Sequence, residues 1–387
     1  MPDLPAVLHV DAAREWRGGQ NQARLLVSEL ARRGLEQALA ARPDSRLAAE
    51  VDALGVRVVP LRWRAGLDPA AVVALAREIR DGGWDVVHAH SSHALQASLL
   101  ALALAGGRSA LVGSRRLDFP LRSPAVWKRA DVVLAVSGPV RDGLVAGGLE
   151  PARVRVVHDG VAVARAGGAG GDGRLRAAAG AGPGDLLVGT AGALVGHKDH
   201  ATFLRAAAVV VGRSPEARFV VAGEGRLRPE LEALVAALGL GARLSLPGHV
   251  PDVADSLADL DVFVLSSSGE GLGSVSLEAM AAGVPVVLAR AGGLAEVAGE
   301  ALPSVPPGDP DALAGAILAL LADPEVRERV ARAGRERVRA FSAGAMAEGT
   351  LDAYRAVVRR RREEALLGRA YRRGRDRAAA RRSADRR

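Results

Sequence analysis

The stretch "DVFVLSSSGEGLGSVSLEAMAAGVPVVLAR" (residues 261–290) decides the fold, because it reads as a strand, a Gly-rich loop, a helix and a second strand in direct succession. Both strand segments are continuous apolar runs, which is typical of parallel strands that are covered on both faces. In open parallel sheets, ligands collect beyond the carboxyl ends of the strands. We therefore expect a binding site in the loop at 269–274, where the first strand ends.

The same alternation of strand-like and helical segments runs along the rest of the chain. The strand-like runs lie at 6–10, 56–60, 85–90, 110–114, 131–137 and 154–160 in the first half, and at 186–194, 218–225, 243–249, 261–267 and 284–290 in the second. A chain of 387 residues exceeds the size at which a single hydrophobic core stops growing. These patterns predict an α/β fold with two Rossmann-like, doubly wound parallel-sheet domains that face each other across a cleft.

Shifts in composition mark the domain boundaries. Residues 165–185 are rich in Gly and Ala and carry no strand pattern, so they predict a linker that contains one short helix. We expect an N-terminal domain at 1–164, a C-terminal domain at 186–342, a closing helix at 343–362 and a basic tail at 363–387.

Composition excludes several classes of site and of protein. The chain has no Cys, which excludes disulfides, thiolate metal sites and Cys nucleophiles. The N-terminus lacks a basic start followed by an apolar core, and the apolar run at 94–106 is shorter than the roughly 20 residues of a membrane span. We expect a cytoplasmic protein.

The net charge of +8 is concentrated at the C-terminus. Residues 359–387 hold 13 Arg against four acids, a net of +9, so the rest of the chain carries about −1. Such a tail is either a solvated, partly helical appendage or a peripheral contact with the anionic inner face of a membrane. Nucleic-acid binding is the weakest alternative, because Tyr371 is the one aromatic residue that interleaves with these arginines.

The loop that follows the strand at 261–267 has the features of an anion site. A helix N-terminus offers unpaired N–H groups, and the helix dipole adds to their attraction for negative charge. The amides of Leu272, Gly273, Ser274 and Val275 are placed to hold a diphosphate, and Gly271 and Gly273 allow close backbone approach.

Two carboxylates, Glu270 and Glu278, flank this anion site and need a different explanation. A capping box for Glu278 requires Ser or Thr three residues earlier, but position 275 is Val. Ionised Glu accepts two hydroxyl donors at once, as vicinal diols present them. One acid for each sugar, with phosphate between them, describes a nucleotide-sugar.

At this point the chain resembles a known family. "GEGLGSVSLEAMAAGVPVV" with the following "GGLAEV" is similar to the E-x7-E signature of the retaining glycosyltransferases of family 4, the "group 1" transferases of the GT-B fold. The likeness extends in order through "RGGQNQARLLVSELARRG", "DVVHAHSSHA", "AVSGPVRDGLVAGG", "VRVVHDGV", "GHKDHATFLRAA" and "GEGRLRPELEALVAALGL". It implies a nucleotide-sugar donor on the C-terminal domain and an acceptor on the N-terminal one. It also implies retention of configuration, no metal, and no cofactor besides the nucleotide-diphosphate-sugar co-substrate.

The resemblance assigns roles to particular residues. Glu270 would face the donor sugar, Glu278 the ribose, and Lys198 in "GHKDH" the diphosphate. The family usually has Arg five residues before this lysine, where this chain has Ala193. Because the chain holds 50 Arg and only two Lys, a lysine at this loop indicates a specific role for this residue.

In the N-terminal half, the resemblance implies that Gly18 and Gly19 lie close to the diphosphate and that His90 faces the donor sugar. His88, His90 and His93 have a spacing that also suggests zinc, but the sequence offers no carboxylate nearby to complete such a site. We therefore expect no metal.

Three other functions compete with transfer to a glycan or lipid-linked acceptor in bacterial cell-envelope polysaccharide or lipopolysaccharide synthesis. A nucleotide-sugar epimerase of the same architecture would use a similar phosphate site, and a non-catalytic nucleotide-sugar-binding protein would keep that site without turnover. An NAD-dependent oxidoreductase needs G-x-G-x-x-G, but Arg228 stands where the third glycine should fall after 223–225.

Overall fold

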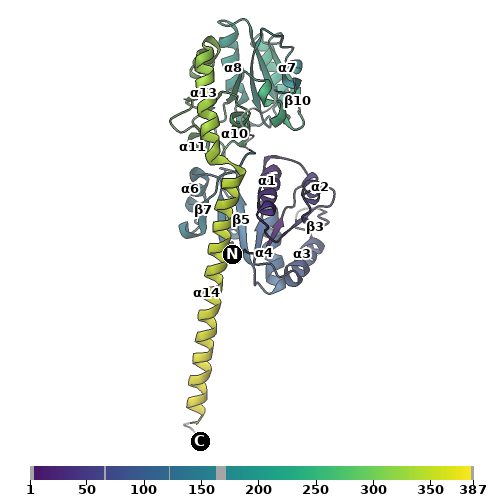
Figure 1. Cartoon of the computed structure of the whole chain (residues 1–387), viewed down its shortest axis with the longest axis vertical. Helices are drawn as coiled ribbons and strands as arrows, with labels where there is room; N and C mark the ends of the chain where they lie inside the picture. Colours follow the sequence, from purple (N-terminus) through teal and green to yellow (C-terminus); the bar gives the residue numbers. More distant parts are fainter. Residues whose placement is uncertain (1–3, 65–66, 122, 163–170, 385–387) are drawn as a thin grey trace.

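The computed structural model describes residues 4–64, 67–121, 123–162 and 171–384, the last part (368–384) by its backbone alone. Two α/β domains are stacked along the long axis of the molecule, and a long C-terminal helix runs beside the N-terminal one (Figure 1). Each domain is built on one parallel sheet, with helices on its faces.

The N-terminal sheet has seven strands in the order β3-β2-β1-β4-β5-β6-β7, and neighbouring strands pair in parallel. The strands are β1 (Val7–Val10), β2 (Gln37–Ala41), β3 (Arg57–Pro60), β4 (Val86–Ala89), β5 (Ala110–Arg115), β6 (Val132–Ala135) and β7 (Val154–Val156).

The C-terminal sheet has six strands in the order β10-β9-β8-β11-β12-β13, again parallel. The strands are β8 (Leu186–Ala191), β9 (Ala217–Ala222), β10 (Leu244–Gly248), β11 (Val262–Leu265), β12 (Val286–Ala289) and β13 (Ser304–Val305). In both sheets the strand order reverses beside the first strand of the domain, so the prediction of two doubly wound parallel-sheet domains is confirmed.

Helices connect the strands and cover the sheets. In the N-terminal domain they are α1 (Gly18–Arg32), α2 (Arg46–Asp52), α3 (Pro69–Asp81), α4 (Ser92–Ala105), α5 (Pro124–Trp127) and α6 (Gly138–Ala146), with the 3₁₀ turn η1 (Pro151–Arg153). The rest are α7 (Arg174–Ala178), α8 (His200–Val211), α9 (Arg228–Ala237), α10 (Ser274–Ala281), α11 (Leu294–Ala298), α12 (Pro310–Ala322), α13 (Pro324–Arg337) and α14 (Ala343–Ala384), with η2 (Gly196–Lys198), η3 (Val253–Asp259) and η4 (Val338–Phe341).

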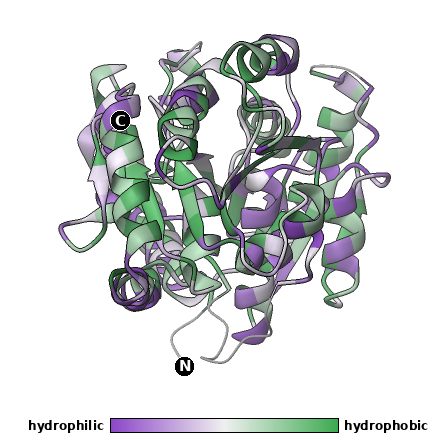
Figure 2. Cartoon of the chain, turned by 90° about the horizontal axis from the view of Figure 1, so that it is seen from above, coloured by the Kyte–Doolittle hydropathy of each residue, from purple (hydrophilic) through white to green (hydrophobic). Residues whose placement is uncertain are grey.

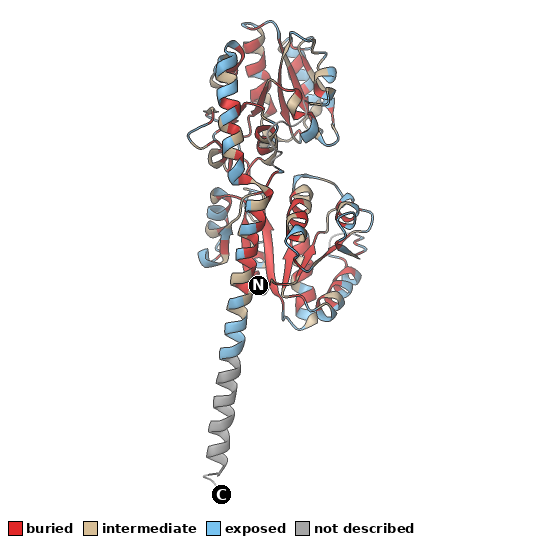
Figure 3. Ribbon diagram, viewed as in Figure 1, coloured by how far each residue is buried: buried red, intermediate tan, exposed pale blue. Residues whose placement is uncertain are grey.

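The central strands lie in the cores of the two domains. β1, β4, β6, β11 and β12 are buried along their whole length, as the red strands of Figure 3 show. Hydrophobic residues line these strands and the inner faces of the helices, whereas hydrophilic residues gather on the outer faces (Figure 2). Burial on both faces explains why these strands are continuous apolar runs.

Strand β2 is absent from the sequence-based prediction. Its sequence, QALAA, is rich in Ala, which favours a helix over a strand, and it lacks the β-branched residues typical of strands. Pairing with both β1 and β3 makes it a strand. Tertiary context here overrides local propensity.

The segment predicted as a linker at 165–185 is docked on the C-terminal domain from Gly171 onwards; its first residues lie outside the described part of the chain. Asp259 accepts hydrogen bonds from the amides of Gly173 (2.8 Å) and Leu175 (2.9 Å). Leu175 is buried in the core of this domain. The predicted short helix exists as α7, but it is a packed part of the domain and not a free connection.

The predicted closing helix and basic tail form one continuous helix, α14, which extends to Ala384 rather than ending at 362. The chain crosses back to the N-terminal domain just before this helix, where Val161 and Ser342 form a parallel bridge. The first half of α14 packs on Leu26, Val86 and Val112. The second half projects beyond the domain (Figure 1).

Candidate active site

The N-terminus of α10 presents amides without protein partners. Gly273 precedes the helix in the left-handed region at φ +82°, and it supplies no side-chain cap. Within the described residues, the N–H groups of Leu272, Gly273, Ser274 and Val275 donate to no protein acceptor. The hydroxyl of Ser276 turns away, to the carbonyl of Gly273 at 2.7 Å. These amides, with the helix dipole behind them, form an anion site.

Glu270 lies just before this anion site, and Lys198 from η2 contacts it. The Lys198 ammonium donates to Glu270 Oε1, and the Ser267 hydroxyl donates to the same oxygen at 3.2 Å. Both charged side chains are largely buried. The two groups that the sequence assigns to opposite parts of a donor are therefore neighbours, and each neutralises the other in the free protein.

Glu278 lies one turn into α10 and faces the N-terminal domain. Its Oε1 accepts a hydrogen bond from Asn21 Nδ2 at 3.3 Å, and Arg24 in turn donates to Asn21 Oδ1 at 3.1 Å. Desolvation raises the pKa of Glu278 to about 7, and the charge of Arg24 and the Asn21 hydrogen bond only partly oppose this shift. At neutral pH this carboxyl is therefore about half ionised.

Helix α1 brings a second unpaired N-terminus to the same place. Within the described residues, the amides of Gly18 and Gly19 donate to no protein acceptor. A Cβ atom built on Gly18 would lie 3.7 Å from Ser274 Oγ, whereas one built on Gly19 would meet nothing within 4 Å. Two helix N-termini, one from each domain, thus converge on one volume.

The loop of Gly271 packs closely against the N-terminal domain. A Cβ atom on Gly271 would lie 2.0 Å from the carbonyl oxygen of Arg116 and 3.2 Å from Val136 Cγ1, both in the N-terminal domain. Sequence reasoning explained this glycine by the approach of a phosphate; the structure adds the approach of the other domain.

Other contacts between the domains involve residues that sequence reasoning missed. The carboxylate of Glu296 accepts a hydrogen bond from the Gly138 amide at 2.7 Å and contacts His158 Nε2 at 2.9 Å. Phe119 packs edge-on against His197, with ring centroids 4.9 Å apart. Glu296 lies in the "GGLAEV" motif, so the sequence could have indicated it as a site residue. No sequence pattern indicates the contact of Phe119 with His197.

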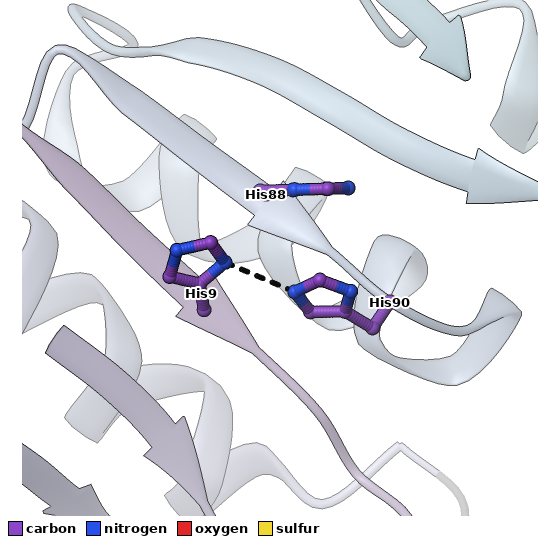
Figure 4. A group of neighbouring side chains, drawn as sticks. All are labelled: His9, His88 and His90. Atoms are coloured by element: carbon purple, nitrogen blue, oxygen red, sulfur yellow. Dashed lines mark hydrogen bonds between the residues drawn. The ribbon is translucent and has the colours of Figure 1, made fainter. Parts of the chain in front are cut away.

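His90, which directly follows β4, belongs to a buried cluster of three histidines (Figure 4). The third member is His9 of β1 and not His93, which is exposed at the start of α4. The register pairs His9 with His88, which places these two rings side by side. The sequence spacing of His88, His90 and His93 thus does not correspond to a group in space, because strand β1 lies closer to His88 and His90 than the start of α4 does.

These three imidazoles are the side chains, among the described residues, that are spaced to share a metal ion. Their nitrogens are hydrogen-bonded to protein: His9 to His90 at 3.0 Å and to Gln37 at 3.1 Å, and His88 to Tyr354 at 2.5 Å and to Ser114 at 2.7 Å. Only the Nδ1 atom of His90 has no partner among the described residues. The cluster reads as a hydrogen-bonded network.

At Ala193 the side chain brings no cation to the site. The carbonyl of Ala193 accepts a hydrogen bond from His200 Nε2 at 3.2 Å, which ties this loop to α8. Lys198, packed over Gly192, is the cation that directly contacts Glu270.

Known proteins match both halves of the chain. Residues 16–165 match the family described as "Glycosyltransferase Family 4", and residues 173–337 match "Glycosyl transferases group 1". A D-inositol 3-phosphate glycosyltransferase from Kribbella flavida is 31% identical over 317 residues, which are 74% of each chain. The chain belongs to the group 1 glycosyltransferases.

Other known proteins are similar to this chain over smaller parts or in fold. The lipopolysaccharide core biosynthesis glycosyltransferase LpsE of Rhizobium meliloti is 39% identical over 128 residues, 33% of this chain and 38% of LpsE. The crystal structure of Anabaena HepE with UDP and glucose superposes with a TM-score of 0.77 at 19% identity, covering 91% of this chain and all of HepE. This likeness confirms the GT-B fold.

Replacing Gly271 with Ala tests whether the domains meet as described. We expect Gly271→Ala to hold the two domains apart, because its Cβ would meet the Arg116 carbonyl of the other domain. Small-angle X-ray scattering should show a larger radius of gyration, with little change in melting temperature. Gly19→Ala, where a Cβ meets nothing within 4 Å, is the matched control. Unchanged scattering for Gly271→Ala would contradict this domain arrangement.

Proposed function

We propose that this glycosyltransferase moves a sugar, with retention of configuration, from a nucleotide-diphosphate-sugar to a glycan or lipid-linked acceptor in the synthesis of bacterial cell-envelope polysaccharide. The observation that carries the proposal is the unpaired N-terminus of α10 between two carboxylates. A dinucleotide-binding oxidoreductase also holds a diphosphate at a helix N-terminus, but after 223–225 this chain has Arg228 where the G-x-G-x-x-G motif needs its third glycine.

Charge flow gives the residues their proposed roles. Breaking the anomeric C–O bond leaves negative charge on the diphosphate and positive charge on the sugar. The amides of 272–275 and the Lys198 ammonium stabilise the leaving diphosphate by preorganised electrostatics. Diphosphate binding draws Lys198 from Glu270, which leaves that carboxylate free to accept hydroxyl groups of the sugar.

The two glutamates do not form a glycosidase pair. Retaining glycosidases hold two carboxyl groups about 5–5.5 Å apart. Glu270 lies in the loop before α10 and Glu278 lies within the helix, and the two contact different partners, Lys198 of η2 and Asn21 of α1. We propose front-face substitution, in which a donor phosphate oxygen receives the acceptor proton and no metal ion or further cofactor takes part.

The comparisons support a UDP-sugar as the first donor to test. HepE structures contain UDP and UDP-glucose, and relatives include enzymes named for lipopolysaccharide core and Vi polysaccharide biosynthesis. A panel of UDP-, GDP- and ADP-sugars, screened by saturation-transfer NMR, identifies the donor. Nucleotide release that depends on added acceptor separates a transferase from an epimerase, which needs none, and from a binder, which releases nothing.

Substitution of the two glutamates separates their roles. We expect Glu270→Ala to lower kcat by about 100-fold or more, because the reacting sugar loses its positioning. Glu278→Ala should raise the donor KM by about 10- to 100-fold, the worth of a charge-assisted hydrogen bond, with kcat nearly unchanged. Nucleotide-release kinetics measure both, with Glu300→Ala at an exposed position as control. An equal loss of kcat in both variants with unchanged donor binding contradicts these roles.

The raised pKa of Glu278 predicts how donor binding depends on pH. Ribose hydroxyls bind the ionised carboxylate, so the donor KM should fall as pH rises through the pKa of about 7. Between pH 6 and pH 8 the ionised fraction, and hence the apparent affinity, grows by about tenfold. Glu278→Gln has no charge to titrate and should give a flat profile. A wild-type profile as flat as that of Glu278→Gln contradicts this role for the carboxyl.

We also propose that the second half of α14 contacts the anionic inner face of a membrane. None of the helices in the described part of the chain is long and apolar enough to cross a membrane. Leu366 and Leu367 are 65% and 71% exposed on α14, and the exposed Arg362 lies one turn before Leu366, so apolar and basic groups lie near each other there.

Vesicle sedimentation tests this contact. We expect the full chain to bind phosphatidylglycerol vesicles and not phosphatidylcholine vesicles, with affinity that falls as salt rises, because each Arg near the surface contributes about 1 kcal/mol. A chain truncated after Glu364 should stay in the supernatant and keep its fold. Equal binding of the full and truncated chains would exclude the tail as the anchor.

A further inference from the structure

A line of hydrogen bonds ends at the unpartnered nitrogen of His90. Gln37 Nε2 donates to the backbone carbonyl of Val27 at 2.9 Å, and Gln37 Oε1 lies 3.1 Å from His9 Nε2. His9 Nδ1 lies 3.0 Å from His90 Nε2 (Figure 4). His90 Nδ1 is buried and has no partner among the described residues.

The Val27 carbonyl and the Gln37 amide determine which atom donates and which accepts in each hydrogen bond of this line. A backbone carbonyl only accepts hydrogen bonds, so the amide nitrogen of Gln37 must face Val27 and its oxygen must face His9. An amide oxygen also only accepts, so His9 Nε2 must carry a proton. The orientation of the amide and the tautomer of His9 therefore follow from bonding partners alone.

The tautomer of His9 in turn determines which nitrogen of His90 carries the proton. A neutral imidazole has one N–H group and one bare nitrogen. His9 is fully buried, and desolvation lowers its pKa to about 4, so its Nδ1 is bare and accepts from His90 Nε2–H. Desolvation likewise lowers the pKa of His90, and the nearby charge of Arg116 adds to this shift. A neutral His90 that is protonated on Nε2 has a bare Nδ1.

His88 stands outside this line. Its ring nitrogens contact the hydroxyls of Tyr354 and Ser114, and hydroxyls both donate and accept. These contacts leave the tautomer of His88 open and impose nothing on His90.

We propose that Gln37 and His9 are positioning residues that hold His90 in the Nε2–H tautomer, so that its Nδ1 is a pure acceptor for a hydroxyl group of the bound sugar. The part that concerns the sugar rests on the proposed function. His90 directly follows β4, at the carboxyl ends of the strands, where parallel sheets bind ligands, and its amide donates to the Val10 carbonyl at 3.0 Å. A buried acceptor without a partner costs free energy in the empty protein, and a sugar hydroxyl removes that cost.

The tautomer is measured directly in the ligand-free protein. Long-range ¹H–¹⁵N correlation spectra of protein with ¹⁵N-labelled histidine distinguish protonated from bare ring nitrogens, and His90→Asn assigns the signals. We expect His90 with a protonated Nε2 and a bare Nδ1. A protonated Nδ1, an imidazolium at pH 7, or nitrogen shifts that move on addition of ZnCl₂ would overturn the inference.

Variants test the positioning role. His9→Leu removes the acceptor for His90 Nε2–H, so we expect a mixture of His90 tautomers and a kcat that is about 5- to 10-fold lower, the size of one neutral hydrogen bond. In His9→Asn the amide oxygen replaces Nδ1, which should restore the single tautomer and most of the turnover. His88→Gln is the matched control, because it alters the same cluster without touching the line, and it should leave the His90 tautomer unchanged. Equal tautomer populations in His9→Leu and wild type would overturn the role of His9.

Donor binding tests the hydroxyl contact. Saturation with the nucleotide-sugar that binds in the donor panel should shift the bare Nδ1 resonance, because the nitrogen then accepts a hydrogen bond. An unchanged Nδ1 resonance in the saturated protein overturns this contact. If no nucleotide-sugar binds, the proposed function fails while the tautomer measured in the free protein stands.

Discussion

The unpaired amides at the start of α10 are the constraint on which the rest of the site depends. They remain unpaired because Gly273, in the left-handed region, supplies no capping side chain, and a Cβ atom there would lie 2.4 Å from Leu294 Cδ2. Other helices in this chain, such as α4 and α12, begin with a Ser or Asp that accepts an amide hydrogen bond. At α10 these donors stay unpaired, and we propose that they bind the diphosphate of the donor, with Glu270, Glu278 and Lys198 beside it.

The path of the chain determines how the N-terminal domain reaches this site. The two crossings between domains lie next to each other, where Val161 and Ser342 form their bridge. Gln22 of α1 holds this crossing through both bonds to Gly160, each 2.9 Å long. Since α1 also carries Gly18 to Ser274, one helix contacts both the crossing and the donor site. A change in the angle between the domains would therefore alter the geometry of the proposed donor site.

Desolvation tunes the titratable groups around this junction in opposite directions. It raises the pKa of Glu278 and lowers the pKa values of His9, His88 and His90. The imidazoles are therefore neutral, so each has one nitrogen that donates and one that accepts a hydrogen bond, whereas Glu278 titrates near neutral pH. The same physical cause thus gives one group a fixed role and another a pH-dependent one.

The sequence by itself determined the two parallel sheets, the Gly-rich strand-to-helix loop at 269–274 and the choice of Glu270 and Glu278 beside it, because these features depend on local periodicity and on neighbouring residues. The choice of Lys198 came from the resemblance to a known family. Only the tertiary structure decided that β2 is a strand, that α14 extends to Ala384, and that His9 rather than His93 joins the histidine cluster. It also decided that Gly271 touches Arg116 and that Asn21 contacts Glu278. These pairs are far apart along the chain, so no local pattern records them; they form when strands align in register and the two domains close.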